Sequence, residues 1–327
     1  MSKIAVIGAG LSGLVLAREL SPYADITLFE KARGVSGRMS TRYADPYQFD
    51  HGAQFFTAKT DPFKQFLAPL IKKGVVGRWD ARFVELTGSE VTASREWGAE
   101  DPRYVGMPQM NQISKYLAEE LKVELPVRIS KIEKHDKHWR LNDEAGEWRG
   151  DFDWVISTAP PIQSADMLPK SFIHHTALQE AKMSGCFTLM LGFEEPLPLL
   201  WDAALVHNSD IGWISVNSSK PGRPESYALL VNSTNSWADQ HLADDREAIK
   251  SYLCKEASRV IGLDVMQANH IVLHFWAYAN IGKQKGEKAL LDEENKLAAC
   301  GDWCIQGRVE AAFTSAMHLA NQLKAYL

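Results

Sequence analysis

The N-terminal stretch reads Ile4-Ala5-Val6-Ile7-Gly8-Ala9-Gly10-Leu11-Ser12-Gly13, an apolar run followed directly by a glycine-rich turn. A helical run continues to Leu20, and a second apolar run, Ile26 to Phe29, ends at Glu30. Apolar runs of these lengths around a G-x-G-x-x-G turn predict a strand, a tight turn, a helix and a second strand. This order is typical of an α/β domain that binds a dinucleotide.

The glycines of this turn let backbone N–H groups approach a pyrophosphate, which the positive end of the following helix stabilises. Glu30 can accept both hydroxyls of an adenosine ribose. An ordinary glycine-rich turn is the plainer alternative. A signal peptide is a second alternative, and the glycines together with Arg18 and Glu19 directly after the apolar run argue against it. The candidate cofactor-binding residues here are Gly8, Gly10, Leu11, Ser12, Gly13, Glu30 and Lys31.

Glu30 and the residues after it form an E-x-x-x-x-x-x-G-R-x-x-T pattern that ends at Thr41. A Rossmann domain that binds only NAD has no use for this pattern, whereas the Arg38 guanidinium can reach a pyrophosphate bidentately. The pattern resembles the second signature of FAD-dependent oxidases of the amine oxidase superfamily, with Ser36 where that family usually has glycine. We therefore expect FAD as the cofactor.

The bulk properties set limits on partners and location. A chain of 327 residues is long enough for two domains. A net charge of −5 gives no electrostatic reason to expect nucleic acid or an anionic membrane as a partner. No apolar stretch approaches the ~20 residues of a membrane helix. We expect a soluble, cytoplasmic protein, and the sequence leaves its oligomeric state open.

The cysteines and histidines do not form a recognisable metal site or disulfide framework. Four cysteines are few for a disulfide scaffold of this length, and Cys300 and Cys304 lack the C-x-x-C spacing and the partners of a zinc site. His174 and His175 stand as a pair with no carboxylate or cysteine pattern nearby. We expect no metal.

The order of elements predicts a discontinuous fold: a Rossmann-type FAD-binding domain, like that of glutathione reductase and amine oxidases, with an inserted α+β substrate domain built on an antiparallel sheet. We assign residues 1–60, 105–160 and 285–327 to the first domain and residues 61–104 and 161–284 to the second. In the first domain we expect a helix within 109–122, a strand over 126–129, a hairpin around Ala145-Gly146 and a buried strand over 152–157.

Residues 186 to 280 have a different sequence pattern, in which short β-like runs are separated by turn-rich segments. One amphipathic helix, about 244–260, interrupts them. The expected strands are 187–193, 213–216, 227–231 and 271–278.

The chain then returns to the first domain with Leu297 to Trp303 and a last helix rich in small residues. In this interpretation Asp302 accepts a hydrogen bond from a ribityl hydroxyl, and the start of the last helix, at Val309, points at the flavin N1 and O2 edge. A strand, loop and helix with an acid near the helix start is the plainer alternative.

Several segments resemble the renalase family, in particular its bacterial members. They are Phe49-Asp50-His51-Gly52-Ala53-Gln54-Phe55-Phe56-Thr57-Ala58, Tyr104 to Pro108, Asn217 to Pro221, Trp276 to Ala279, and Gly301 to Glu310. The G-A-Q-F-F-T and G-D-W-C-x-x-G-R-V-E blocks are far more specific than the glycine motif.

The resemblance implies a non-covalent FAD enzyme that oxidises 2- and 6-dihydro isomers of NAD(P)H to NAD(P)⁺ and reduces O₂ to hydrogen peroxide. It implies that Ala53 and Gln54 touch the flavin and that Val127 binds the adenine side through its backbone. The substrate residues it implies, together with our aromatic candidates for the pocket wall, are Phe55, Phe56, Thr57, Ala58, Lys59, Cys186, Trp276 and Tyr278. One departure is Phe275, where the family often has arginine.

This chemistry needs no side-chain acid or base, because a dihydropyridine expels hydride with the help of its own ring nitrogen and the flavin N5 accepts it. The alternatives are a flavin-containing amine oxidase, a non-catalytic or redox-sensing flavin protein, and a redox-neutral flavin mutase. Two cations, Lys59 and Lys220, are candidates for steering an anionic dinucleotide, or else are solvated surface lysines.

Overall fold

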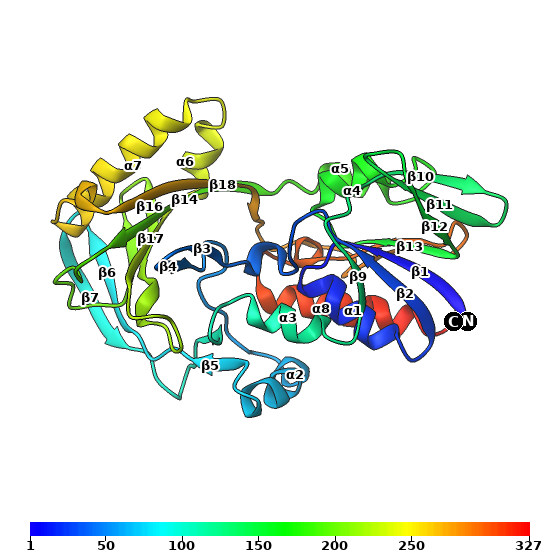
Figure 1. The fold of residues 1–327 in the computed structure, drawn as a ribbon, viewed down its shortest axis with the longest axis horizontal. Coiled ribbons are helices and arrows are strands. Elements are labelled where there is room, and N and C mark those ends of the chain that lie inside the picture. The colour runs from blue at the N-terminus through cyan, green and yellow to red at the C-terminus, as the bar shows by residue number, and fades with distance from the viewer. The chain divides into compact units, whose positions relative to one another are not determined.

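The computed structural model describes residues 1–327, and the chain forms two compact units (Figure 1). Unit 1 consists of residues 1–38, 113–183 and 281–327. Unit 2 consists of residues 39–112 and 184–280. Both units are therefore assembled from segments that are far apart in the sequence.

Four segments lie in a different unit from the one that the sequence predicts. Residues 39–60 lie in unit 2, because Tyr47 and Phe49 pack there against Met190 and Leu230. Residues 105–112 also lie in unit 2, where the Met110 N–H donates to Asp50. Residues 281–284 lie in unit 1, where Ile281 joins the core. Residues 161–183 lie in unit 1, where Phe172 and other apolar side chains of this segment join the core.

Unit 1 is built on a six-stranded sheet with the order β19-β20-β13-β1-β2-β9. The strands from β20 to β9 are all parallel, and only β19 is antiparallel to its neighbour. Parallel strands buried on both faces need an apolar sequence, which explains the unbroken apolar runs at Ile4 and Ile26. The strands are β1 Ser2–Ile7, β2 Ala24–Phe29, β9 Lys122–Glu124, β13 Trp154–Ser157, β19 Leu290–Asp292 and β20 Leu297–Ala299.

Helices cover one face of this sheet, and a second, three-stranded sheet with two short helices covers the other (Figure 1). The helices α1 and α8 pack against each other. On the opposite face, Trp139, Leu141 and Phe152 of the small sheet contribute to the buried core. The elements are α1 Leu11–Leu20, α3 Gln112–Ala118, α8 Val309–Leu323, α4 Pro161–Met167, α5 His175–Glu180, β10 Ile129–His135, β11 His138–Asp143, β12 Trp148–Phe152, and the 3₁₀ helices η1 Gly37–Met39 and η4 Asp302–Cys304.

Unit 2 is built on a seven-stranded sheet with the order β18-β14-β17-β16-β15-β6-β7. All pairs are antiparallel except β15 with β6, so the sheet is mixed and not purely antiparallel. The strands are β6 Arg82–Thr87, β7 Glu90–Glu96, β14 Ser184–Phe193, β15 Ala203–His207, β16 Ile211–Val216, β17 Tyr227–Ser233 and β18 His270–Asn280.

The helix α7 lies along one face of this sheet (Figure 1) and buries Leu253 and Cys254 in the larger core of the unit. Tyr47 and Phe49 cover part of the other face. The remaining elements are β3 Arg42–Ala44, β4 Tyr47–Phe49, β5 Val76–Arg78, β8 Tyr104–Gly106, α2 Asp61–Lys72, α6 Asn235–Gln240, α7 Arg246–Ile261, and the 3₁₀ helices η2 Asn217–Ser219 and η3 Val265–Gln267.

Most of the helices and strands that the sequence predicts are present, and the prediction of one strand is wrong. The sequence predicts a strand over 126–129, whereas the chain forms β9 at Lys122–Glu124, turns, and begins β10 only at Ile129. The expected hairpin is present, and Gly146 supplies its turn with a φ of 80°. The β6–β7 hairpin is not among the expected elements, and every residue of its second strand, β7, is exposed, so no buried face marks this strand.

The other sequence-level expectations concern cysteines and membranes. All four cysteines are free thiols and are buried. Among the helices of the structure, none combines the length and the apolar character that a bilayer crossing requires.

Strand β14 provides a test of the core of unit 2. Leu189 is fully buried, so Leu189→Ala should lower the free energy of unfolding by about 2–5 kcal/mol through lost burial and a cavity. Leu205→Ala, at a position that is 37 % exposed, is the matched control and should cost less than about 1 kcal/mol. Denaturant unfolding followed by tryptophan fluorescence measures both; equal losses in the two variants would contradict the placement of Leu189.

Candidate functional site

The glycine turn of unit 1 requires glycine at its first and third positions. Gly8 has a φ of +108°, which favours glycine. A Cβ on Gly13 would collide with the Gly8 carbonyl oxygen and lie 2.9 Å from Thr158 Oγ1. A Cβ on Gly10 would meet no atom within 4 Å, so the turn leaves open space beside Gly10 at the start of α1.

The N-termini of α1 and α8 carry no side-chain cap. Uncapped helix starts present backbone N–H groups and the positive end of the helix dipole, which suit an anion. The Ser12 hydroxyl donates to the Ala312 carbonyl at 3.0 Å and thereby ties α1 to α8. Of the predicted residues in this turn, Ser12 therefore offers a ligand its backbone rather than its hydroxyl.

Glu30 lies at the end of β2 and is 8 % exposed. One carboxylate oxygen accepts the Ala9 N–H at 2.9 Å, and the other accepts the Ala32 N–H at 2.8 Å. Because each oxygen can accept a second hydrogen bond, this geometry leaves capacity for ribose hydroxyls. The Val127 N–H donates to the Glu30 carbonyl at 2.8 Å, so the backbone atom that Val127 offers to an adenine is its carbonyl oxygen.

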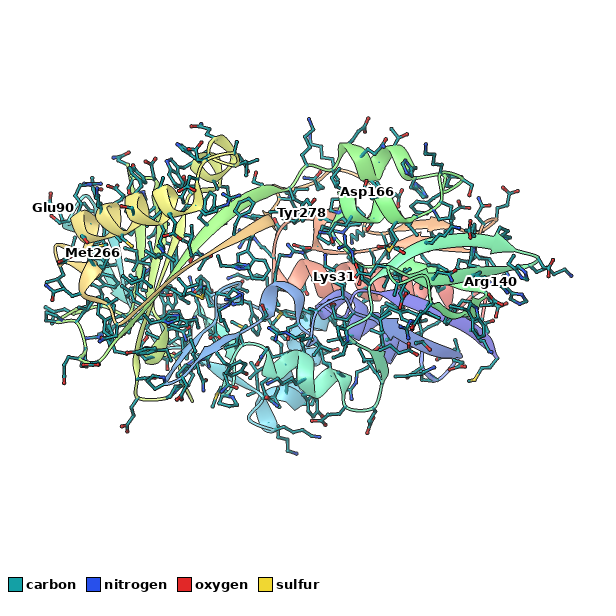
Figure 2. All side chains as sticks on the ribbon, turned by 45° about the horizontal axis from the view of Figure 1, so that its top comes forward. Lys31, Glu90, Arg140, Asp166, Met266 and Tyr278 are labelled. Atoms are coloured by element: carbon teal, nitrogen blue, oxygen red, sulfur yellow. The ribbon has the colours of Figure 1, made fainter.

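Lys31, labelled in Figure 2, follows β2 directly and donates to Gln163 Oε1 at 2.9 Å. Burial and the nearby Arg128 cation lower the pKa of Lys31 below its usual value. Its ammonium is thus engaged with α4, a contact that the motif does not predict.

Arg38 and Asp302 form a bidentate ion pair, with Nη1–Oδ2 and Nη2–Oδ1 distances of 2.8 and 2.5 Å. Sequence reasoning assigns Arg38 to a pyrophosphate and Asp302 to a ribityl hydroxyl, and it missed this pairing across 264 residues. Asp302 is 5 % exposed and stands in η4, shortly before Val309 opens α8. The pair holds two predicted cofactor residues at one place in unit 1.

The predicted cofactor residues of unit 1 therefore lie at the glycine turn, directly after β2, in η1 and η4, and at the starts of α1 and α8. Open space beside Gly10, two uncapped helix starts, an acceptor at Glu30 and a cation at Arg38 fit the phosphates and ribose of a dinucleotide.

In unit 2, two histidines and a tryptophan form a compact cluster. His51 and His274 have ring centroids 4.8 Å apart, and Trp276 lies 4.5 Å from His274. The Trp276 indole N–H donates to the His51 carbonyl at 2.8 Å. Burial lowers the pKa of both His51 and His274 to about 4, so both imidazoles are neutral at pH 7. Sequence reasoning identified Trp276 but neither histidine, because a single histidine in a strand carries no local signal.

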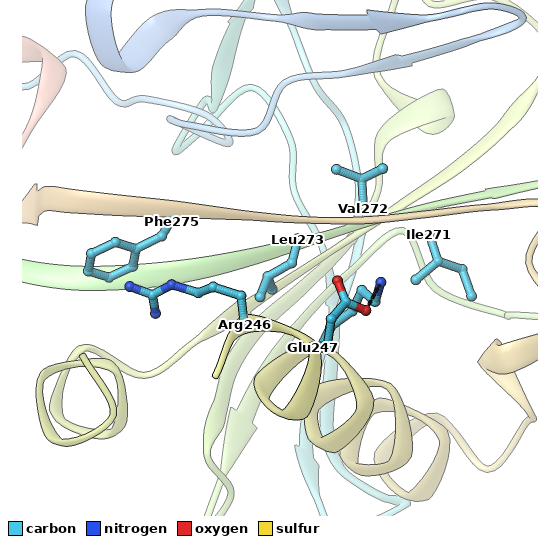
Figure 3. Close-up of a pocket in the computed structure, with 7 residues that line it drawn as sticks. Arg246, Glu247, Ile271, Val272, Leu273 and Phe275 are labelled. Carbon is cyan, nitrogen blue, oxygen red and sulfur yellow. Dashed lines mark ion pairs between the residues drawn. The ribbon is translucent and has the colours of Figure 1, made fainter. Parts of the chain in front are cut away.

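Phe275 lies on the opposite face of β18 from His274 and Trp276, because successive side chains of a strand alternate. Figure 3 shows Phe275 beside Arg246 of α7, whose guanidinium carbon lies 4.8 Å from the Phe275 ring centroid and 4.9 Å from that of Phe187. Phe275, where the renalase pattern often has arginine, thus packs against α7 and lies on the other face of β18 from Trp276.

The G-A-Q-F-F-T block holds two different aromatic environments. Phe55 is half-buried and lies 4.9 Å from Trp97 and 5.5 Å from Trp213, measured between ring centroids. Phe56 is buried and bonds to Tyr104 through paired backbone hydrogen bonds. Ala53, Thr57 and Ala58 are half-buried, and Lys59 is exposed and pairs with Asp101 at 2.8 Å.

The Gln54 side chain is bonded entirely within unit 2. Its Nε2 donates to the carbonyls of Asp50 and Gly52 at 2.7 and 2.9 Å, and its Oε1 accepts from Ser215 and Lys220 at 2.8 and 3.2 Å. The sequence offers two predictions for Lys220, a cation that steers a dinucleotide or a solvated surface lysine. Both are wrong, because the Lys220 side chain is fully buried.

Two further predicted substrate residues lie on strands of the large sheet. Cys186 of β14 is buried among Ser233 and Asn232, and burial raises the pKa of its thiol. Tyr278, labelled in Figure 2, is half-buried near the end of β18. The structure places Trp276 and Tyr278 two residues apart on the same strand, and hence on one face of it.

Comparison with known proteins identifies the family. Residues 6–70 match an NAD(P)-binding Rossmann-like domain, and residues 81–324 match the family described as flavin containing amine oxidoreductase. The chain belongs to the flavin-containing amine oxidoreductase family. It is a flavin-dependent oxidoreductase, and FAD is its cofactor, in agreement with the FAD signature around Arg38.

Solved structures share the fold of this flavoprotein at low sequence identity. A putative protoporphyrinogen oxidase from Exiguobacterium sp. 255-15 has a TM-score of 0.80 at 12 % identity, over 100 % of this chain and 99 % of its own. A putrescine oxidase bound to putrescine has a TM-score of 0.69 at 11 % identity, over 99 % of each chain. At these identities the similarity establishes the fold alone.

The predicted cofactor residues of unit 1 generate a prediction about Glu30. The purified protein should release intact FAD on denaturation, and Glu30→Lys should weaken FAD binding on the order of 100-fold or more, because the lysine cannot accept the ribose hydrogen bonds. Glu120→Lys, at a side chain that is 88 % exposed, is the matched charge reversal and should leave binding unchanged. Fluorescence titration with FAD measures both; a flavin that stays attached after denaturation would show that the cofactor is covalent.

Proposed function

We propose that this flavoprotein oxidises 2- and 6-dihydro isomers of NAD(P)H as a renalase-type oxidase: dihydro-NAD(P), O₂ and a proton give NAD(P)⁺ and hydrogen peroxide. The observation that carries this proposal is the pair of specific blocks, Gly52 to Ala58 and Gly301 to Glu310. The first block supplies the Phe55 and Phe56 environments in unit 2, and the second supplies Asp302 and the start of α8 in unit 1.

The chemistry of the unit 2 residues agrees with this proposal. When bound, FAD supplies the hydride acceptor and passes two electrons to O₂. The side chains need to hold a flat ring and exclude water, and no proton transfer by a side chain is required. Phe55, Trp276 and Tyr278 offer aromatic surface for a nicotinamide, and the neutral His51 and His274 place no positive charge beside the NAD(P)⁺ ring formed in the reaction.

Amine oxidation is the second candidate, favoured by membership of the amine oxidoreductase family and by the fold shared with putrescine oxidase. A third candidate is a flavin protein that binds FAD without turnover or as a redox sensor. The three candidates differ in what reduces the flavin.

Anaerobic mixing distinguishes the three functions. The 2- and 6-dihydro isomers of NAD(P)H should bleach the flavin rapidly, whereas amines such as putrescine should not. Ordinary 4-dihydro-NAD(P)H should be slower on the order of 100-fold, since a pocket that holds C2 or C6 against the flavin misplaces C4 by about 1 Å or more. Rapid bleaching by amines would establish an amine oxidase, and no bleaching by either class would leave the non-catalytic role.

Lys59 is the remaining candidate for contact with the phosphates of a dinucleotide. Its ion pair with Asp101 is exposed to solvent, so its contribution should be small and sensitive to salt. Lys59→Ala should raise the concentration of dinucleotide needed for half-saturation about two- to fivefold at low salt, and leave the limiting rate of flavin reduction unchanged.

The controls for Lys59 are Lys72→Ala, an exposed lysine at the end of α2, and a dihydronicotinamide without phosphates. Neither should show the effect. If Lys59→Ala matches the parent protein at every ionic strength, other residues bind the phosphates.

A further inference from the structure

Lys220 is the most deeply buried cation of unit 2. Its side chain has 0 % exposure, and its ammonium lies inside a cluster with Asp50 and Arg223, whose side chains are each 1 % exposed. The cluster holds one carboxylate and two basic groups, so it carries an excess positive charge away from water whenever Lys220 is protonated. Burying an ammonium costs free energy unless hydrogen bonds and opposite charges compensate for the lost water. Packing alone therefore does not explain why Lys220 is buried.

The acceptors around Lys220 give that reason. Its ammonium donates to Asn217 Oδ1 at 2.9 Å and to Gln54 Oε1 at 3.2 Å, and lies 3.6 Å from Asp50 Oδ2. Trp79 closes the site, with the ammonium 5.4 Å from a ring centroid. One of the three contacts of the ammonium is therefore with a side chain of the G-A-Q-F-F-T block.

The same hydrogen bonds determine how the Gln54 amide is oriented. Two backbone carbonyls, of Asp50 and Gly52, require the NH₂ group on one side, and the Lys220 ammonium requires the carbonyl oxygen on the other. A rotated amide would place oxygen against two carbonyl oxygens and NH₂ against an ammonium. Through its bonds to the Asp50 and Gly52 carbonyls, the Gln54 side chain also stabilises the turn formed by residues Asp50 to Gln54.

We propose that Lys220 is a positioning residue, whose buried ammonium holds Gln54 and the Asp50–Gln54 turn in the conformation that contacts FAD. The role of the turn in contacting FAD rests on the proposed function, because it comes from the same resemblance. Lys220 itself touches Gln54, Asn217 and Asp50 and acts on the cofactor only through them.

The charge of Lys220 couples this arrangement to pH. Burial lowers its pKa to about 7, against the attraction of Asp50 and together with the repulsion of Arg223. These are the two charged groups that face it; Gln54, Asn217 and Trp79 are neutral. Below pH 7 the ammonium holds Gln54 with a charged hydrogen bond, and above pH 7 this bond weakens to that of a neutral amine.

Lys220→Met should fold, which makes the proposal testable. The substitution leaves Asp50 and Arg223 as a balanced ion pair. Asn217 Oδ1 keeps the Asp50 N–H, and Gln54 Oε1 keeps the Ser215 hydroxyl. The control Lys72→Met removes an exposed lysine from α2.

The experiment is a double-mutant cycle read by FAD affinity, without any substrate. Lys220→Met and Gln54→Leu should each weaken FAD binding about tenfold, the double variant should be within about twofold of either, and Lys72→Met should match the parent protein. Losses that add, or unchanged binding in a folded Lys220→Met protein, would overturn the proposal.

A pH titration of the flavin absorption spectrum gives a second test that does not depend on Lys220→Met folding. The spectrum of the parent protein should shift with a midpoint near pH 7, and Gln54→Leu should abolish the shift. A parent spectrum that is constant from pH 6 to 8, or a shift that persists in Gln54→Leu, would overturn the proposal. A protein that passes both tests yet leaves dihydronicotinamides unoxidised would refute the proposed function and leave the role of Lys220 intact.

Discussion

The buried carboxylate of Asp50 is the interaction on which unit 2 depends. It accepts hydrogen bonds from the Thr41 hydroxyl at 2.7 Å, the Met110 N–H at 3.0 Å and the Arg223 guanidinium, and it lies beside Lys220. These partners come from three separate stretches of the chain. The two cations lower the pKa of Asp50, which keeps it ionised although it is completely buried. Removing this single charge would leave Arg223 and protonated Lys220 in the interior without a counterion, which is strongly destabilising.

Unit 1 depends on a different constraint, the close approach of backbone to backbone at the glycine turn. Thr158, which follows β13, donates to the Gly8 carbonyl at 2.9 Å, and Gly13 leaves no room for a side chain at the same place. The turn therefore locks the end of β1 to α1 and to the neighbouring strand, and it presents the open side at Gly10 to a ligand. Gly8 and Gly13 are required by this packing and are also predicted cofactor residues, so we expect a substitution at either position to disturb both packing and FAD binding.

The electrostatics of the candidate residues differ in kind between unit 1 and unit 2. The unit 1 residues offer full charges and helix ends, which suit phosphates and ribose. The unit 2 candidates are aromatic rings, neutral imidazoles and an amide, and the Lys220 ammonium donates to the oxygen of that amide, Gln54 Oε1. The predicted residues of unit 1 therefore suit an anion, and the candidates of unit 2 suit an uncharged group.

The sequence by itself determined the features that rest on contiguous residues: the strand, turn and helix at Ile4 to Leu20, the FAD signature at Arg38, the hairpin at Gly146 and the apolar strands of the large sheet. Local periodicity and turn chemistry are sufficient for these. Only the tertiary structure decided which residues meet. The burial of Lys220, its bond to Gln54 across 166 residues and the pairing of Arg38 with Asp302 have no local signal, because a lysine or an aspartate looks alike in the sequence whether it is solvated or enclosed. Whether a charge lies in water or inside the protein depends on neighbours that the chain brings from far away, and the energies involved exceed any local preference.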